Sequence, residues 1–316
     1  MNKKTQDDEV EKAAKLLHAG KLVAFPTETV YGLGGNALSD ASVAAIYAAK
    51  NRPEFNPLIV HIPSITEAKK YVRWDERAQI LAEKFWEGEG AGSLTFVLQR
   101  LENCALSLLV SAGMDTVAIR KPAHPLAITL LEKSGLPLAA PSANKSGKIS
   151  PTLARHVVEE LGDKVAMVLD GGACTVGIES TIIDLSTTPA TILRHGKITR
   201  EELEKYIEIA DYNGSEIKSA GMMKSHYAPS AKLRLNATDL QDGEALLAFG
   251  APFINNENVQ NLSKNKDLEE AAANLFKMLR ALDASGAEKI AVMPIPMVGI
   301  GIAINDRLNR AAAPRD

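Results

Sequence analysis

The apolar residues of this chain come in short runs that are separated by amphipathic stretches. Runs of about five residues, the length of a buried strand, occur at positions 58–62 (LIVHI), 94–98 (LTFVL) and 116–120 (TVAIR). Because strand and helix patterns mix without strict alternation, residues 1–200 are predicted to form an α/β or α+β fold around a mixed sheet. The other elements predicted there are strands at 21–30 (interrupted by Pro26), 166–172, 180–185 and 191–196, helices at 7–17 and 41–50, and a helix, a glycine stop and a strand within 124–144.

The pattern changes after Tyr206. Residues 207–231 are rich in Gly, Ser, Asn and Pro and have no sustained period, but Met222, Met223 and Tyr227 give this segment side chains that can pack. We therefore predict three parts, which are a catalytic domain (1–206), an ordered linker (207–231) and a small α/β domain (232–316). The small domain rests on strands at 244–253 and 289–295 and on helices at 268–282 and 303–313.

Composition and charge exclude several classes of protein. Hydrophobic residues make up 46% of the 316 residues, so the chain can bury a core without disulfides, and its two cysteines are too far apart to suggest a metal site. No apolar run approaches the roughly 20 residues that span a bilayer, and the first twenty residues lack a secretory signal, so we expect a cytoplasmic protein that does not enter membranes. The net charge is −3, yet residues 91–156 carry seven basic and three acidic groups, which suits an anionic ligand.

A cationic cluster precedes the strand at 58–62. Lys50 would end a helix, Arg52 follows it, and Asn56 stands between two prolines in the sequence KNRPEFNP. A rigid loop with two positive charges and an amide donor meets the needs of a triphosphate. The alternative is a helix C-terminus stabilised by Lys50 beside a solvated Arg52.

A second cluster follows the strand at 116–120. Arg120 falls at the end of this strand, where ligands collect in α/β folds, and His124 lies at a predicted helix start. The loop APSANKSGKISP (140–151) then offers several hydroxyl groups, which either hold phosphate or ribose oxygens or satisfy their own turn.

Two further patterns leave their roles open. The glycines of GLGGNA (32–37) are predicted to form a loop that approaches a ligand or a tight turn, and they do not fit a dinucleotide site because the preceding segment breaks the strand-to-glycine junction. Glu28, Asp170 and Glu179 are candidate carboxylates for Mg²⁺, although the metal ligands cannot be read from the sequence.

Taken together, seven stretches resemble those of the YrdC-like threonylcarbamoyl-AMP synthases, in the same order. The resemblance covers about residues 10–232, and GMMKSHYAPSAKL (221–233) with the last domain resembles the long, two-domain form of that family. It implies a twisted mixed sheet with surrounding helices and a concave cationic surface, joined to a smaller Rossmann-like α/β domain. The seven stretches are FPTETVYGLGGNA, KNRPEFNPLIVH, GSLTFV, TVAIRKPAHP, APSAN, IESTIID and ILRHG.

The resemblance also implies a reaction. L-threonine, bicarbonate or CO2, and ATP with Mg²⁺ would give threonylcarbamoyl-AMP and pyrophosphate, and the product would pass to a transferase that modifies tRNA. Such a reaction relies on positioning and charge stabilisation, which agrees with the absence of any nucleophile motif in the sequence.

Site residues follow from the same resemblance. The catalytic residues would be Lys50, Arg52 and Arg120, with Arg120 facing the threonine carboxylate, and Tyr227 would make the linker a lid over the nucleotide. The remaining residues implied for the ATP site are Asn56, Thr116, Ser142, Asn144, Ser150 and Arg194. Those implied for the threonine site, besides Arg120, are Thr29, His61, Ala140 and Ser180.

Other functions on the same fold are an RNA-binding module and a nucleotide sensor. The mildly acidic chain disfavours the first, since RNA binders of this kind need a strongly basic face, and leaves room only for a weak RNA contact. A carbamoyl-transfer module of hydrogenase maturation proteins is disfavoured because its accompanying segments do not occur in the sequence.

Overall fold

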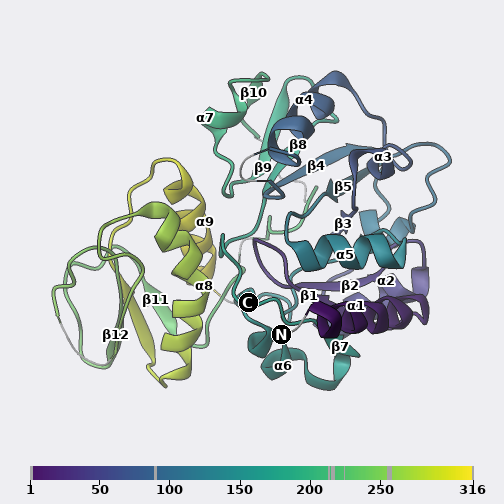
Figure 1. Ribbon diagram of the computed structural model, residues 1–316. Coiled ribbons are helices and arrows are strands. Elements are labelled where there is room, and N and C mark those ends of the chain that lie inside the picture. The colour runs from purple at the N-terminus through teal and green to yellow at the C-terminus, as the bar shows by residue number, and fades with distance from the viewer. Residues whose placement is uncertain are drawn as a thin grey trace.

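The computed structural model describes residues 3–88, 91–212, 214, 218–223, 225–254 and 258–314, apart from the side chains of residues 3 and 4. Within these residues a mixed sheet of ten strands forms the larger part and a parallel sheet of four strands the smaller part (Figure 1). The predicted α/β class, with a mixed sheet followed by a second α/β unit, is confirmed. Of the predicted linker 207–231, residues 213, 215–217 and 224 lie outside the described part.

The strands of the larger sheet lie in the order β10-β9-β8-β4-β5-β3-β6-β2-β1-β7. They are β1 (Val23–Phe25), β2 (Gly32–Asn36), β3 (Ile59–His61), β4 (Leu94–Gln99), β5 (Thr116–Arg120), β6 (Leu138–Ala139), β7 (Met167–Val168), β8 (Thr181–Asp184), β9 (Ala190–Arg194) and β10 (Ile209–Ala210). The helices of this part are α1 (Lys3–His18), α2 (Asp40–Lys50), α3 (Ile65–Ala68), α4 (Glu76–Phe85), α5 (Pro125–Ser134), α6 (Ala154–Leu161) and α7 (Arg200–Leu203), with 3₁₀ turns at Leu108–Ser111 and Gly162–Lys164.

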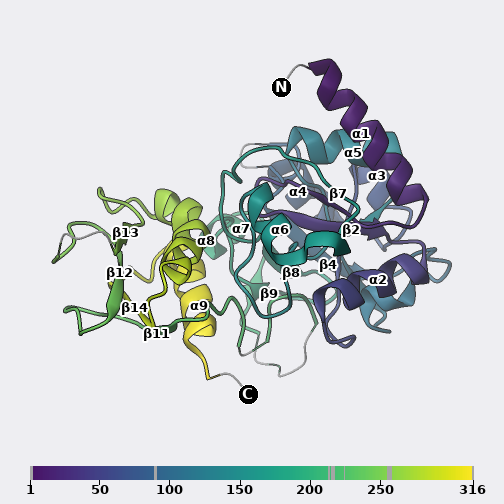
Figure 2. The ribbon, with the colours of Figure 1, turned by 90° about the horizontal axis from the view of Figure 1, so that it is seen from below.

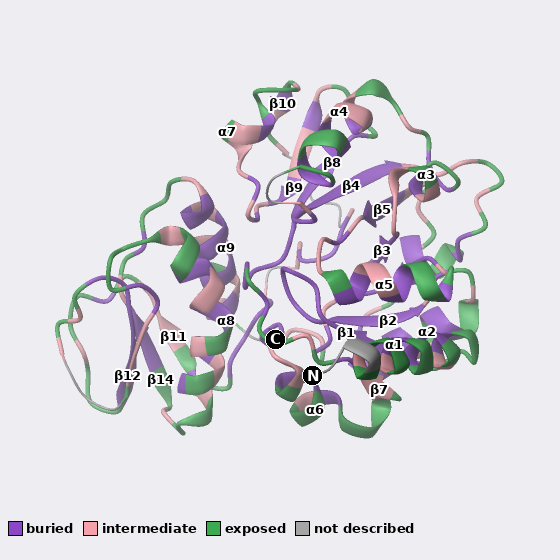
Figure 3. Cartoon of the chain, viewed as in Figure 1, coloured by how far each residue is buried: buried purple, intermediate pink, exposed green. Residues whose placement is uncertain are grey.

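Burial follows the layers of this part. The central strands are buried along their length, whereas α1 and α5, which pack side by side, leave their outer faces exposed (Figure 3). Trp86 and Phe96 stack in the core with ring centroids 4.5 Å apart. The sheet therefore forms a rigid floor for the loops at its strand ends.

The parallel pair β3 and β5 fixes one side of the later site. His61 and Arg120 are register partners at the C-terminal ends of these two strands. The prediction that Arg120 ends a strand is confirmed, and the pairing places His61 directly beside it.

Helix α2 determines where the cationic loop begins. The side chain of Ser39 caps its N-terminus by accepting a hydrogen bond from Ser42 N, and Asn51 ends it in the left-handed conformation (φ 49°). Lys50 is thus the last helical residue, as predicted, and Arg52 opens the connection to β3.

The glycine-rich run at 32–37 differs from its predicted loop or turn. Residues Gly32–Asn36 form strand β2, which pairs antiparallel with β1 and β6. A Cβ atom on Gly34 would lie 2.8 Å from Cε1 of Phe25. Gly34 is needed because the strand packs closely against this ring, and the glycines here do not form a turn.

The smaller part carries its helices on one face. Its sheet has the order β11-β14-β12-β13, and α8 and α9 lie between this sheet and the larger part (Figures 1 and 2). Its elements are β11 (Lys232–Arg234), β12 (Glu244–Ala248), β13 (Val259–Asn261), α8 (Leu268–Ala284), β14 (Lys289–Val292) and α9 (Ile300–Ala312). The two helices therefore face the larger part of the chain.

Candidate active site

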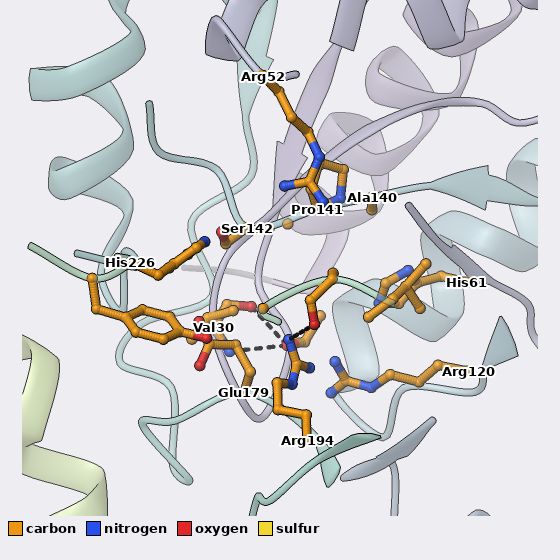
Figure 4. A pocket seen from close by; sticks show the side chains of 16 residues that line it. Val30, Arg52, His61, Arg120, Ala140, Pro141, Ser142, Glu179, Arg194 and His226 are labelled. Carbon is orange, nitrogen blue, oxygen red and sulfur yellow. Dashed lines mark hydrogen bonds between the residues drawn. The ribbon is translucent and has the colours of Figure 1, made fainter. Parts of the chain in front are cut away.

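A cavity of about 40 Å³ lies where the ends of β3 and β5, the loops after β1 and β6, and the linker meet. The side chains of Arg52, Arg120 and Arg194 point into it from different sides (Figure 4). Among the described residues that line it, Glu179 is the one carboxylate, so the site is strongly cationic and suits an anionic ligand. The other lining residues are Thr27, Val30, Gly32, Ile59, His61, Ala140, Pro141, Ser142, Ala220, Gly221, His226 and Tyr227.

Arg120 is held from two sides and keeps part of its guanidinium for the cavity. Its Nε donates to the carbonyl oxygen of Gly92 at 2.6 Å, and its Nη2 donates to Thr29 Oγ1 at 2.8 Å and pairs with Glu28. Nη1 has no hydrogen-bond partner among the described residues. A guanidinium fixed in this way presents a free N–H edge to a ligand carboxylate.

Glu28 is committed to the protein through both carboxylate oxygens. One pairs with Arg120, and the other accepts from Ala123 N at 2.8 Å. Gly92, with φ +85°, makes room for this carboxylate, since a Cβ there would lie 2.7 Å from Glu28 Oε1. Glu28 therefore orients Arg120, and among the three carboxylates that the sequence offers as candidates for Mg²⁺ it is a poor one.

Arg52 and Asn56 form one rigid unit. Arg52 donates to Asn56 O at 3.0 Å and to Asn56 Oδ1 at 2.6 Å, and also to Pro57 O at 2.8 Å. Burial lowers the pKa of Arg52 to about 10, and Arg194 adds to the shift, so the guanidinium remains charged at neutral pH. The alternative of a solvated Arg52 is wrong, since the residue is buried.

Lys50 reaches across to the serine-rich loop. Its Nζ donates to the carbonyl oxygen of Ser142 at 2.5 Å and also to that of Asn144. Burial, together with the charge of Arg52, places the pKa of Lys50 well below its ordinary value. Lys50 thus fixes the loop that presents Ser142 to the cavity, while Asn144 stands behind it and donates to Lys145 O and Lys148 O.

Arg194 and Ser180 join the end of β9 to the start of β8. Arg194 Nε donates to Ser180 O and its Nη2 to Ser180 Oγ, both at 3.0 Å. Ser180 Oγ also lies 2.7 Å from Thr95 Oγ1. Burial lowers the pKa of Arg194 to about 10.

Two neutral histidines line the cavity. Burial lowers the pKa of His61 to about 3, with a further contribution from Arg120, and burial lowers the pKa of His226 to about 3 as well. The Nδ1 atoms of both rings are buried and have no partner among the described residues. Both rings are therefore neutral at pH 7.

Glu179 and Ser150 connect the cavity to the second domain. Ser150 Oγ donates to Glu179 Oε1 at 2.5 Å, and Arg307 Nε of α9 donates to Glu179 Oε2 at 3.0 Å. The sequence offered Glu179 only as a metal candidate and did not indicate Arg307, His226 or Thr27. The motif IES (178–180) was the one available signal for Glu179.

The other predicted residues fall at different distances from the cavity. Six of them do not line the cavity but contact residues that do: Thr29, Ser180, Lys50, Asn56, Asn144 and Ser150. Thr116 lies at the opposite end of β5 from Arg120 and is not part of the lining. Asp170 accepts from Tyr31 and from Gly172 N. The described residues contain no group of three or more His, Cys, Asp or Glu side chains that could hold a metal ion.

Comparison with known proteins covers both parts of the chain. Residues 15–196 match the Sua5/YciO/YrdC family, described as telomere recombination, and residues 198–313 match the C-terminal domain of threonylcarbamoyl-AMP synthase. The chain is 41% identical to the threonylcarbamoyl-AMP synthase of Pyrococcus abyssi (96% of this chain, 94% of the relative) and 40% identical to that of Bacillus subtilis (98% and 95%). The crystal structure of P. abyssi Sua5 complexed with L-threonine superposes with a TM-score of 0.88 at 39% identity, covering 97% and 94% of the two chains.

An arginine-lined cavity on a mixed sheet, bordered by a linker to a small parallel-sheet domain, defines a two-domain protein of the Sua5/YciO/YrdC type. More narrowly, the chain belongs to the threonylcarbamoyl-AMP synthase family, whose enzymes are nucleotidyltransferases that serve tRNA modification. In the described part of the chain, no helix is both long and apolar enough to cross a membrane.

Proposed function

We propose that this protein joins L-threonine, bicarbonate or CO2, and ATP into threonylcarbamoyl-AMP, releasing pyrophosphate. The observation that carries the proposal is the convergence of Arg52, Arg120 and Arg194 on one cavity. One carboxylate and a triphosphate are the anions of this reaction, and guanidinium groups recognise both.

The threonine end of the site is proposed to lie around Arg120. Its free Nη1 takes the substrate carboxylate, while Thr29 and Glu28 hold the guanidinium in place. His61 and Ala140 line the same region, and Ser180 supports it through Arg194. Ala140 offers a methyl contact for the side chain of threonine.

The nucleotide end is proposed to lie toward the linker. Arg52, Ser142, Arg194 and Tyr227 line it. Behind them, Lys50 donates to the carbonyl oxygen of Ser142, and Asn56 accepts from Arg52. Asn144 donates to Lys148 O in the loop that carries Ser142, and Ser150 donates to Glu179 in the same wall. A contact between Thr116 and the nucleotide stays a prediction from the family resemblance.

Positioning carries the proposed chemistry. The amine of threonine loses a proton and attacks CO2 to give a carbamate, and a carbamate oxygen then attacks the α-phosphorus as pyrophosphate leaves. Arg52 and Arg194 would stabilise the charge that develops on the phosphates, since fixed cations in a dry site act strongly. No protein nucleophile is required.

Magnesium is proposed to arrive with ATP. Glu28 and Glu179 are each bound to an arginine and a second donor, so these carboxylates do not form a ready metal site. Mg²⁺ commonly binds through substrate phosphates with few protein ligands. We therefore assign no step to a protein-held metal.

The linker is proposed to act as a lid. Ligand pockets measure about 300–1,000 Å³, far more than the 40 Å³ of this cavity, so a wall must move to admit a nucleotide. Ala220, Gly221, His226 and Tyr227 form the wall that belongs to the linker. Closure would shield the labile carbamate from water, after which the product passes to a tRNA-modifying transferase, with at most a weak RNA contact.

Pyrophosphate release from the purified protein tests the function. The complete mixture contains ATP, Mg²⁺, L-threonine and bicarbonate, and each component is omitted in turn. We expect release that requires both threonine and bicarbonate. Release without threonine would point to another adenylation, and ATP binding without release would favour a nucleotide sensor.

A further inference from the structure

The C-terminal domain sends one arginine into the interior of the catalytic part. Arg307 lies on α9, and its side chain is fully buried. Its Nε donates to Glu179 Oε2 at 3.0 Å, across a sequence separation of 128 residues. Burying a guanidinium so far from water is costly unless it is paired, which makes this contact a specific feature of the domain arrangement.

Arg307 also contacts the residue that the linker brings to the cavity. Its guanidinium carbon lies 5.4 Å from the ring centroid of Tyr227, within the range of a cation–π interaction. The ring of Tyr227 also packs against an apolar side chain, since it stacks on Phe276 of α8 with ring centroids 5.4 Å apart. Two helices of the C-terminal domain thus hold the ring of Tyr227 at the cavity wall.

Glu179 connects Arg307 to the cavity, because it is bonded to Arg307 and lines the cavity. It also accepts a hydrogen bond from Ser150. Burial alone would raise the pKa of Glu179, but Arg307, Arg194 and Ser150 together hold it below its ordinary value, so the carboxylate is charged. Of the two arginines, Arg307 makes the direct ion pair with Glu179, whereas Arg194 is hydrogen-bonded to Ser180.

We propose that Arg307 is a positioning residue for the nucleotide: through Glu179 and Tyr227 it sets the side of the cavity that Ser150 and the linker form. The C-terminal domain therefore completes the active site without contributing a lining residue from α9. This inference rests on the proposed function in that it takes the ligand at Tyr227 to be ATP.

ATP binding measured by calorimetry, without turnover, tests the inference on Arg307→Gln. We expect the Kd for ATP to rise about 10-fold or more, since small misplacements of binding groups have effects of this size. In steady-state assays the KM for L-threonine should stay within about 2-fold, because Arg120 and its partners do not contact Arg307. An unchanged Kd for ATP, or an equal rise for both substrates, would overturn the proposal.

Arg280→Gln is the matched control. Arg280 lies on α8 and also makes an ion pair between the two parts, to Glu160 at 2.6 Å, and it donates to the carbonyl oxygen of Ile149, but it contacts neither Glu179 nor Tyr227. We expect this variant to lower the melting temperature while the Kd for ATP stays within about 2-fold of the parent value. If it weakens ATP binding as much as Arg307→Gln, domain docking alone explains the effect and the proposal fails.

The double variant Glu179→Gln/Arg307→Gln covers the case in which Arg307→Gln does not fold. It removes both charges of the Glu179–Arg307 ion pair together, so neither member of the pair is left buried without its partner, and it should fold. Its Kd for ATP should still exceed that of the parent about 5-fold, because Tyr227 loses its cation and Ser150 its charged acceptor. A parental Kd in the folded double variant would contradict the proposal. ATP binding that responds as expected in a protein that releases no pyrophosphate would keep this inference and remove the proposed function.

Discussion

Arg120 and Glu28 form a buried ion pair in the wall of the cavity, and the pair leaves Nη1 of Arg120 without a protein partner among the described residues. The second oxygen of Glu28 is tied to Ala123 N, and Thr29 receives a further hydrogen bond from the guanidinium. The arginine is thus oriented before any substrate arrives, which lowers the entropy cost of binding a carboxylate.

Replacing Arg120 is expected to change the KM for L-threonine much more than the KM for ATP. Arg120→Ala is expected to raise the KM for L-threonine about 100-fold while changing the KM for ATP only a few-fold, because a charge-assisted contact to the carboxylate is lost. Initial-rate kinetics with each substrate varied at saturating levels of the other measures both values. An unchanged dependence on threonine would remove Arg120 from the threonine site.

The preference for threonine over serine depends on one methyl group. A methyl contact in an apolar pocket is worth about 1–3 kcal/mol, so kcat/KM for serine should be lower by about 10- to 200-fold. The comparison is made by pyrophosphate release with either amino acid. Equal use of the two would show that Ala140 and its neighbours do not enclose the side chain.

Gly221 is predicted to be essential to the linker wall. It has φ +87°, and a Cβ there would lie 2.9 Å from Cδ of Arg194 and 3.1 Å from the hydroxyl oxygen of Tyr227. Gly221→Ala should therefore weaken ATP binding about 10-fold, since it displaces groups of the proposed nucleotide site.

Gly113→Ala is the control for this substitution. Gly113 has φ +80°, but a Cβ there would meet nothing within 4 Å. It carries the same backbone strain of about 1–2 kcal/mol without the collision, so only the free energy of unfolding should change. If both variants bind ATP equally well, the close approach at Gly221 has no role in binding.

Acid is expected to destabilise the fold through its buried histidines. The pKa values of His61 and His226 are about 3 in the folded protein, chiefly because of burial, whereas an unfolded histidine titrates near 6.5. Between these values the unfolded chain binds protons that the folded chain does not. Stability is therefore complete above pH about 6.5 and falls below it by about 1.4 kcal/mol per pH unit for each histidine.

Urea unfolding at several pH values between 7 and 5 measures this dependence. The variant His61→Gln should show a smaller slope of unfolding free energy against pH, because one of the histidines whose pKa is lowered in the folded protein is gone. A slope identical to that of the parent would mean that folding does not lower the pKa of His61.

Local patterns predicted the elements that carry the site. The apolar run at 116–120 correctly predicted that Arg120 ends a strand, and the helical pattern correctly predicted that Arg52 lies just after a helix that ends at Lys50. The resemblance in seven motifs then indicated that these residues share one site. The structure brings Arg52, His61, Arg120, Ala140, Ser142, Arg194 and Tyr227 to one cavity.

Features that depend on packing were not predictable in this way. The strand at Gly32–Asn36 has no side-chain pattern, and its Gly34 is required by the ring of Phe25 from another strand. Arg307 lies on an amphipathic helix and resembles a solvated residue in the sequence. Only the docking of α9 against the larger part shows that it is buried beside Glu179.

The most direct test of the account is the identity of the adenylated product. The protein is incubated with ATP, Mg²⁺, L-threonine and carbon-labelled bicarbonate, and the quenched mixture is analysed by mass spectrometry. We predict a species that contains AMP, threonine and one labelled carbon, formed together with pyrophosphate. An adenylate of threonine without the label, or labelled carbon that never joins AMP, would contradict the account.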